Sequence, residues 1–230
     1  MNREKIKKTY VYYLNKEGFI SKVAQAIVNL LGRNKIKCKK GNEVQIKNLV
    51  RNTSIRVIGE RNKVIILGEI NNCKVNIEGN DNDIYIGKGS VLLGSAITEL
   101  DDGNKIYIGE NVGIQNNTRI VALEGKKITI GDNCSISYEV EIRNSDAHSL
   151  FMKSGDSYYR SNFASDITIG KNVWIAQQVL ILKGTVIGDN CVIGAKSLVH
   201  KLVAPDNSLV LGMPSKVVKT EIKWSFEREG

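Results

Sequence analysis

The sequence repeats every six residues along its C-terminal part, and this period restricts the fold more than any other feature. Aliphatic side chains stand at six positions in this phase: Ile169, Ile175, Ile181, Ile187, Ile193 and Val199. A helix repeats every 3.6 residues and a simple strand every two. Neither period places Gly170, Gly188 and Gly194 in the same phase. A short strand followed by a tight turn does, so we expect a series of strand-turn units.

The same phase returns upstream and shows how the units stack. The string I-x-I-G begins at Ile84, Ile106, Ile128 and Ile167, at successive offsets of 22, 22 and 39 residues. We assume that three hexads make one triangular coil of 18 residues. An offset of 22 residues then corresponds to one coil with a four-residue loop, and the offset of 39 residues to one coil with 21 further residues. The pattern predicts an all-β parallel β-helix with an aliphatic interior and a projecting loop at about residues 144–165.

The rest of the chain divides around this β-helix. We expect the β-helix at 41–215, with decayed repeats over 41–80, and a C-terminal tail at 216–230. Residues 1–40 form a basic segment with 11 Lys or Arg against 2 Asp or Glu, and the whole chain has a net charge of +9. Apolar residues at helical spacing predict a short helix at residues 21–31. Glycine after each aliphatic residue suits corners where φ is positive.

Composition excludes several classes of protein. No aliphatic stretch approaches the roughly 20 residues that cross a bilayer, and the N-terminus lacks the apolar region of a secretory signal, so we expect a cytoplasmic protein. The four cysteines are widely spaced, and we expect no metal site. Cys134 and Cys191 occupy a small-residue position of the hexad and are interpreted as packing residues. Basic residues are not interleaved with stacking aromatics, which argues against nucleic acid.

One segment has the residue types of a general-base site. His148 lies where the hexad phase breaks and the long loop begins, and Asp146 stands two positions before it. In an extended segment the two side chains would share a face, and a carboxylate there could orient the imidazole and stabilise its cation. The alternative is a polar loop that contains both residues by chance.

Three segments carry a resemblance to a known family. EIRNSDAH, the hexads from DITIGKNVW to KSLVHK, and LGMPSKVVK resemble the hexapeptide acyltransferases, in particular bacterial O-acetyltransferases of capsular and other surface polysaccharides, including polysialic acid. The resemblance covers about residues 84–224. It implies a left-handed β-helix, a homotrimer with active sites between subunits, and transfer of an acetyl group from acetyl-CoA to a sugar hydroxyl by direct attack on the thioester, without a metal.

The resemblance also implies roles for individual residues. His148 would be the general base with Asp146 as its partner, and Trp174 would lie beside the thioester. The coenzyme A arm would contact Ala176, Gln177 and Ala195, although many relatives have glycine at Ala176 and at Lys196. The residues expected to line the rest of the donor site, near its phosphates, are His200, Lys201, Lys216 and Lys219.

The acceptor is less defined by the sequence. Tyr158, Tyr159 and Arg160 on the long loop suit stacking on sugar rings and pairing with a carboxylate, and the basic N-terminal segment suits an anionic acceptor or a membrane surface. The same loop could instead support the trimer. Two alternative functions keep the fold: N-acetylation of a nucleotide-linked amino sugar or a small drug, and a non-catalytic β-helix scaffold.

Overall fold

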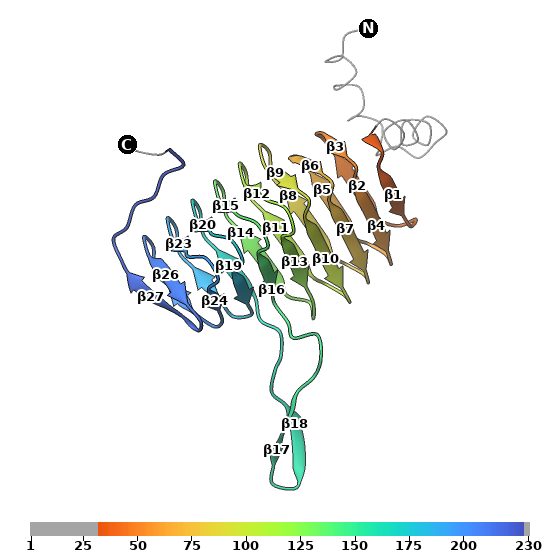
Figure 1. The fold of residues 1–230 in the computed structure, drawn as a ribbon. Coiled ribbons are helices and arrows are strands. Elements are labelled where there is room, and N and C mark those ends of the chain that lie inside the picture. Colours follow the sequence, from red (N-terminus) through yellow and green to blue (C-terminus); the bar gives the residue numbers. More distant parts are fainter. Residues whose placement is uncertain (1–31, 228–230) are drawn as a thin grey trace.

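The computed structural model describes residues 32–227, and the elements in this range are strands arranged as a parallel β-solenoid of about eight turns (Figure 1). The prediction of an all-β parallel β-helix is confirmed. The helix expected at residues 21–31 and most of the basic segment lie outside the described residues. The first strand begins at Lys35, earlier than the boundary expected at residue 41, and the last extends to Lys219, past the boundary expected at 215.

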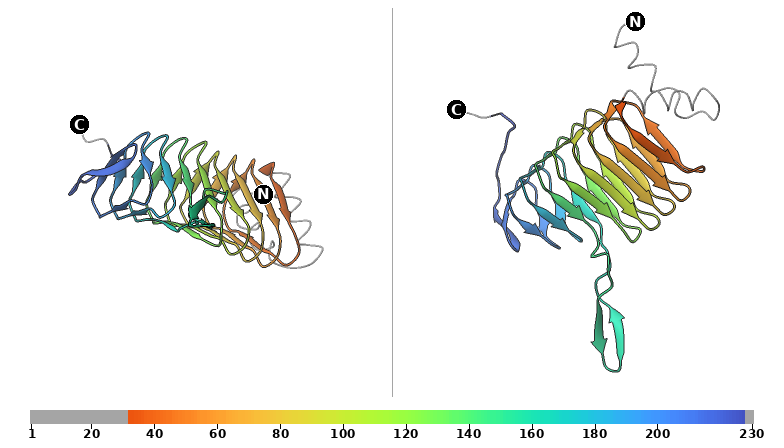
Figure 2. Two further views of the ribbon diagram at one scale, coloured as in Figure 1. Left: turned by 90° about the horizontal axis from the view of Figure 1, so that it is seen from below. Right: turned by 45° about the vertical axis from the view of Figure 1, so that its right-hand side comes forward.

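Each turn contributes one strand to each of three sheets, which form the three faces of the prism (Figure 2). Sheet A consists of β1 (Lys35–Cys38), β4 (Ser54–Ile58), β7 (Lys74–Glu78), β10 (Ala96–Leu100), β13 (Arg119–Ala122), β16 (Glu141–Arg143), β21 (Leu180–Leu182) and β24 (Leu198–Val199). Sheet B consists of β2 (Glu43–Ile46), β5 (Lys63–Ile66), β8 (Asp83–Ile86), β11 (Lys105–Ile108), β14 (Lys127–Ile130), β19 (Ile167–Ile169), β22 (Val186–Ile187) and β25 (Val203–Ala204).

Sheet C closes the prism and includes one antiparallel strand. It consists of β3 (Val50–Arg51), β6 (Glu69–Asn71), β9 (Val91–Leu93), β12 (Gly113–Ile114), β15 (Ser135–Ile136), β20 (Trp174–Ile175), β23 (Val192–Ile193), β26 (Leu209–Gly212) and β27 (Ser215–Lys219). The last of these, β27, turns back and pairs antiparallel with β26. The tail that we expected from residue 216 therefore begins as the edge strand of sheet C.

Residues at equivalent positions of the sequence repeat pair with one another in neighbouring coils. Ile84 pairs with Ile106, Ile106 with Ile128, and Ile128 with Ile167, all in sheet B. The hexad aliphatic residues alternate among the sheets, and their side chains fill the interior, where nearly all are buried. Burial of this continuous aliphatic column is the main favourable contribution to folding.

The additional residues of the longer coils enter at one corner, where the chain passes from sheet A to sheet B. From Ile108 to Ile114 and from Ile114 to Ile120 the spacing is six residues, but from Ile120 in sheet A to Ile130 in sheet B it is ten. The long loop enters at the same A–B corner, between β16 and β19, and forms an antiparallel hairpin of β17 (Phe151–Ser154) and β18 (Ser157–Arg160). The projecting loop is thus confirmed (Figure 1).

At the corners, the residues with positive φ are not the glycines that follow the hexad aliphatic residues, as we expected. Gly131 and Gly170 do not have positive φ; a Cβ on Gly131 would lie 2.5 Å from the carbonyl oxygen of Gly170 in the next coil. These glycines therefore permit close approach between coils. Positive φ falls on asparagines such as Asn133 and Asn190 (both 58°), a residue that tolerates the left-handed region.

The buried cysteines are packing residues, as predicted. Cys134 and Cys191 are fully buried in the core, and neither forms a disulfide. Burial raises the pKa of the Cys134 thiol to about 12. A buried thiol with so high a pKa is a poor nucleophile at neutral pH, which agrees with a packing role for Cys134.

Candidate active site

The segment that carries His148 leaves the solenoid directly after β16. Asn144 and Ser145 are still buried, and Asn144 fixes the turn by accepting a hydrogen bond from the backbone N–H of Leu123 at 2.9 Å. Asp146 and His148 are exposed. The premise that this segment is extended is wrong, because Ala147 between them has φ of 65°. Asp146 and His148 therefore do not share the face of a strand.

Asp146 is held by a lysine that the sequence did not single out. Lys183, on the next coil, is almost wholly buried and forms an ion pair with Asp146 Oδ2. Asn162 donates a second hydrogen bond to the same oxygen, at 2.8 Å. Burial disfavours the charged carboxylate, but the hydrogen bonds from Lys183 and Asn162 outweigh it and lower the pKa of Asp146. Asp146 is thus a stable anion bound to Lys183.

The same contacts fix the backbone at His148. Asn162 Nδ2 also donates to the carbonyl oxygen of His148, at 2.7 Å, and Lys183 Nζ donates to the carbonyl oxygen of Asn162, at 3.1 Å. The two arms of the hairpin are closed against each other at their base. The exposed His148 imidazole has no hydrogen bond or ion pair among residues 32–227, so its ring nitrogens are available to a substrate or a second chain.

His200 and Lys201 lie at the same corner, directly after β24. The backbone N–H of Lys201 donates to the carbonyl oxygen of Lys183 at 3.3 Å. Burial and the charges of Lys201 and Lys183 lower the pKa of His200, and Asp146 opposes this shift. The structure therefore brings His200 and Lys201 into the cluster of Asp146, Lys183 and the His148 segment.

The predicted acceptor residues separate into two groups. Tyr158 and Tyr159 are exposed on β18, away from the solenoid (Figure 1). Arg160 instead turns back: its Nη2 donates to Glu124 Oε1 at 2.7 Å, and its guanidinium lies 4.9 Å from the centre of the Phe163 ring. The hydrogen bond from Arg160 is the main reason that the pKa of Glu124 is lowered. Arg160 thus anchors the hairpin, and only the tyrosines are free.

Trp174 lies in sheet C, on another face of the prism from the A–B corner. It is 42% exposed and is partly covered by the C-terminal tail. The ring of Trp224 is 6.1 Å from that of Trp174, and Trp224 Nε1 donates to the carbonyl oxygen of Asn172 at 2.8 Å. Phe226 packs edge-on against Trp224 at 4.8 Å. Trp174 is therefore the base of a three-ring aromatic surface.

Three of the predicted coenzyme contacts follow strands of sheet C, in which Trp174 lies, whereas His200 and Lys201 lie at the A–B corner. Ala176 and Gln177 follow β20 at the corner between sheets C and A, and Ala195 follows β23 in the next coil; the backbone N–H of Lys196 donates to the carbonyl oxygen of Gln177 at 3.0 Å. Lys216 and Lys219 are exposed on β27. The predicted site residues of one chain thus form two groups, one at the A–B corner around His148 and one around Trp174 on sheet C.

Sequence reasoning missed Lys183 and Asn162. Lys183 stands two positions after a hexad aliphatic residue, as do Lys171, Gln177 and Asp189, all of which are exposed. The pattern therefore gave no signal that Lys183 is buried. No three His, Cys, Asp or Glu side chains in the described part of the chain are grouped as a metal ion would require. No helix within residues 32–227 is long and apolar enough to cross a membrane.

Known proteins share both the repeat and the whole solenoid. The family described as bacterial transferase hexapeptide (six repeats) matches residues 166–201. The crystal structure of the polySia-specific acetyltransferase NeuO aligns with 86% of this chain and 90% of its own, with a TM-score of 0.78 and 29% identity. The chain thus has the hexapeptide repeat of bacterial transferases at residues 166–201 and a solenoid similar to that of NeuO.

Two further proteins that are similar to this chain are described as O-acetyltransferases. The polysialic acid O-acetyltransferase OatWY aligns with 85% of this chain and 89% of its own, with a TM-score of 0.69 and 28% identity. The galactoside O-acetyltransferase of Escherichia coli (strain K12) is 39% identical over 80 residues, 35% of this chain and 36% of the relative. The chain spans about a third of the length of the curated relatives it matches, 28% and 36% for the first two.

Proposed function

We propose that this protein is an acetyl-CoA-dependent O-acetyltransferase that acetylates a sugar hydroxyl of a bacterial surface polysaccharide or its precursor. The observation that carries the proposal is the exposed, unpartnered His148 imidazole on a backbone fixed by Lys183 and Asn162. It is supported by NeuO and OatWY, which match along most of the chain and are described as acting on polysialic acid.

The proposed reaction is a single displacement. A ring nitrogen of His148 accepts the proton of the sugar hydroxyl while the oxygen attacks the thioester carbonyl carbon. The carbon–sulfur bond then breaks, the acetyl ester is formed, and the coenzyme thiolate leaves with the proton from the imidazolium. General-base catalysis of this kind contributes roughly 10²- to 10⁴-fold. In the described arrangement Asp146 binds Lys183 and Asn162 through Oδ2 and forms no hydrogen bond with the His148 imidazole.

The separation of His148 from Trp174 supports a shared site. On one chain His148 belongs to the A–B corner and Trp174 to sheet C. A cyclic oligomer brings two different surfaces of the same chain together at each interface. We propose that the protein is a homotrimer in which Trp174, Ala176, Gln177 and Ala195 of one subunit bind the donor beside His148 of its neighbour. Lys201, Lys216 and Lys219 are proposed to pair with its phosphates.

The experiment that tests this function is release of free thiol from acetyl-CoA with neutral, sialylated and amino sugars as acceptors. We expect turnover that depends on a sugar hydroxyl and gives a product labile to hydroxylamine, as an ester is. A stable amide formed from an amino sugar would identify an N-acetyltransferase instead. No turnover with any acceptor would contradict the enzyme and favour a scaffold.

A further inference from the structure

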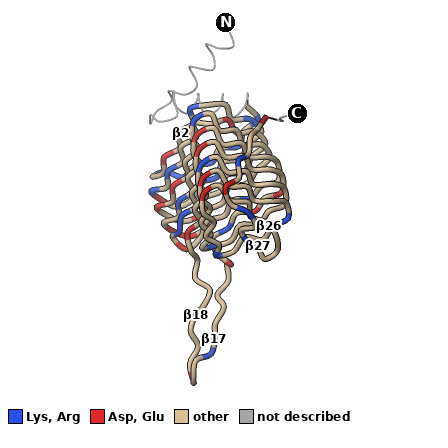
Figure 3. The backbone as a smooth tube through the Cα atoms, turned by 90° about the vertical axis from the view of Figure 1, so that its left-hand side faces the viewer, with Lys and Arg blue, Asp and Glu red and all other residues tan. Residues whose placement is uncertain are grey.

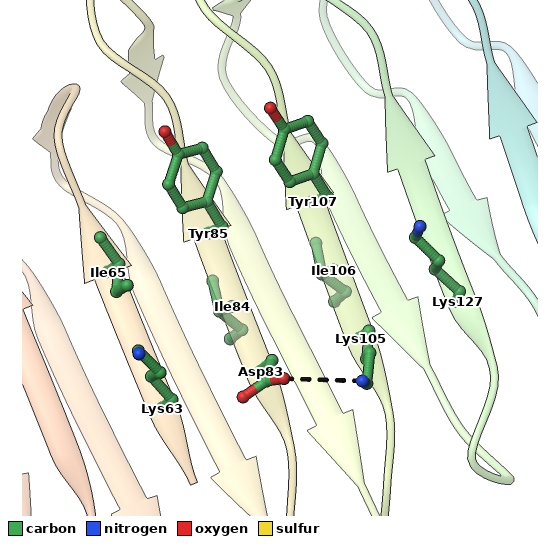
Figure 4. A pocket seen from close by; sticks show the side chains of 9 residues that line it. All are labelled: Lys63, Ile65, Asp83, Ile84, Tyr85, Lys105, Ile106, Tyr107 and Lys127. Carbon is green, nitrogen blue, oxygen red and sulfur yellow. Dashed lines mark ion pairs between the residues drawn. The ribbon is translucent and has the colours of Figure 1, made fainter.

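A shallow groove of about 300 Å³ crosses the outer face of sheet B (Figure 4). It spans β5, β8, β11 and β14. Its centre is a pair of tyrosines: Tyr85 and Tyr107 occupy the same register position on adjacent coils, and their rings are stacked with centres 4.9 Å apart. Tyr107 is 39% exposed. The rings give the groove an amphipathic wall of fixed orientation.

The opposite side of the groove is a row of charged residues at one register position. Lys63, Asp83, Lys105 and Lys127 follow one another on successive coils. Asp83 pairs with Lys105 at 3.8 Å (Figure 4), and both are well exposed; such surface pairs contribute little and are easily exchanged. Lys63 pairs with Glu43, the next position of the same row, at 3.5 Å. Among the described residues, Lys127 is therefore the lysine of the groove that is left without a carboxylate partner.

On the side of the solenoid that Figure 3 shows, basic and acidic residues are interspersed along the coils. The groove combines the stacked tyrosines with Lys105 and Lys127, which lie on adjacent coils about 4.8 Å apart. An extended chain with repeated negative charges and ring-shaped units fits this combination better than a small anion does.

The row leads to the base of the hairpin. Ile128 pairs with Ile167 in the next coil, so the register position after Lys127 is Asp166, the last residue before β19. Asp166 Oδ1 accepts a hydrogen bond from the backbone N–H of Lys127 at 2.8 Å, and its carbonyl oxygen accepts one from Gly184, next to Lys183. One end of the groove thus lies beside the corner that holds His148.

We propose that this groove is a second binding site, for an acidic polysaccharide chain, with sugar rings against Tyr85 and Tyr107 and carboxylates at Lys127. The inference rests on the proposed function and adds that the acceptor is a polymer held at a distance from the reacting hydroxyl. A second copy of this chain fits the groove less well, because the unpaired Lys127 would then lose its solvation without gaining a carboxylate partner from the same groove.

The test is equilibrium binding of polysialic acid, measured by calorimetry without acetyl-CoA, with neutral dextran as the comparison. The first variant is Tyr85→Thr/Tyr107→Thr. Threonine suits this strand position, because Thr129 and Thr168 occupy it in the next two coils. The second is Lys127→Gln. The matched control is Lys74→Gln, which removes an exposed lysine from sheet A.

We expect wild type to bind polysialic acid and not dextran. The double threonine variant should bind about tenfold more weakly, and Lys127→Gln about threefold more weakly with a reduced dependence on salt. The control should bind as wild type does. If the double variant does not fold, Lys127→Gln decides the question. Because no donor is present, absence of acetyl transfer would contradict the proposed function without affecting this result.

Three outcomes would overturn the proposal: no binding of polysialic acid by wild type, equal binding by wild type and both variants, or equal binding of dextran. A change in sedimentation of the double threonine variant would also overturn it, because the groove would then be an interface between copies of this chain.

Discussion

Lys183 and Asp146, 37 positions apart in the sequence, form an ion pair at the base of the hairpin, and the lysine side chain is only 7% exposed while the aspartate is 46% exposed. The pair connects the coil of β21 to the segment of His148. Its two members are unequal: the lysine has left water almost completely, whereas the aspartate can be rehydrated if its partner is lost.

This inequality predicts an asymmetric effect of substitution. Asp146→Asn leaves a buried ammonium without its counter-charge and should lower the free energy of unfolding by about 2 kcal/mol, less than for a fully buried pair because Asp146 is half exposed. Lys183→Met should cost about 1 kcal/mol. The double variant should be more stable than Asp146→Asn alone. Urea denaturation measures all three, and strict additivity of the two single effects would contradict the account.

The pH dependence of this pair has a definite sign. Because the pKa of Asp146 is lowered in the folded state, the pair stabilises the protein above the ordinary pKa of an aspartate. That contribution is lost as the pH falls through the folded-state pKa.

A buried glutamate in the core should make stability fall as pH rises. Glu99 stands in the interior row of sheet A between Ile77 and Ala122. It is fully buried, and neither carboxyl oxygen has a hydrogen-bond partner. Burial, and to a lesser degree the charge of Asp83, raise the pKa of Glu99 to about 9. The carboxyl is therefore protonated in the folded protein at neutral pH and ionised in the unfolded chain.

The contribution of Glu99 to the free energy of unfolding is fully retained below the pKa of this glutamate in the unfolded chain. It is lost as the pH rises toward its folded-state pKa of about 9. Between pH 5 and 8 the free energy of unfolding should decrease by about 1.4 kcal/mol per pH unit from this group. Glu99→Gln should remove that slope, and Glu99→Ile should raise stability at pH 7 by about 3 kcal/mol. Equal slopes for wild type and Glu99→Gln in urea titrations at several pH values would contradict the assignment.

The tail should support Trp174. Trp224→Ala removes the ring beside Trp174 and the hydrogen bond to Asn172, and should lower stability by about 1–2 kcal/mol and weaken acetyl-CoA binding. Trp224→Phe keeps an aromatic ring but lacks the N–H, so its loss of stability should be about half of the loss in Trp224→Ala. The fluorescence emission of Trp174 measures whether the tail covers this side chain. Unchanged stability and emission in Trp224→Ala, after allowance for the lost fluorophore, would show that the tail does not pack there.

A shared site predicts complementation between inactive variants. His148→Ala and Trp174→Ala each remove one group of predicted site residues. In mixed trimers some interfaces pair an intact His148 with an intact Trp174, so co-expression at equal amounts should restore about a quarter of the wild-type activity. Tagged purification of the mixed species and thiol-release assays measure this. Mixed oligomers that stay inactive would contradict a site formed between subunits.

The repeat predicted the solenoid well because its interior depends on local spacing. Ile84, Ile106 and Ile128 stack in the predicted order, since each coil must bury the same corner against its neighbour. The hairpin could be located by the phase break alone. The positive φ expected of the glycines after hexad aliphatic residues, such as Gly131 and Gly170, was wrong, because close approach between coils and a positive φ both favour glycine and the sequence does not separate them.

The candidate site was less predictable, because its contacts are between distant residues. Lys183 reaches Asp146 across 37 positions from a hexad position that is exposed elsewhere. Arg160 pairs with Glu124 across 36 positions instead of remaining free for a substrate. The sequence pattern shows which residues face in or out of the solenoid, but at the hairpin that alternation ends and side-chain partners are decided by the tertiary fold.

The central claim is that His148 is the general base of acetyl transfer, and the turnover number of His148→Ala tests it most directly. His148 lies on an exposed turn without side-chain partners among the described residues, so the variant should fold as wild type does by circular dichroism and thermal melting. Its kcat for acceptor-dependent thiol release should fall by roughly 10²- to 10⁴-fold. A folded His148→Ala protein with near wild-type kcat would contradict the account.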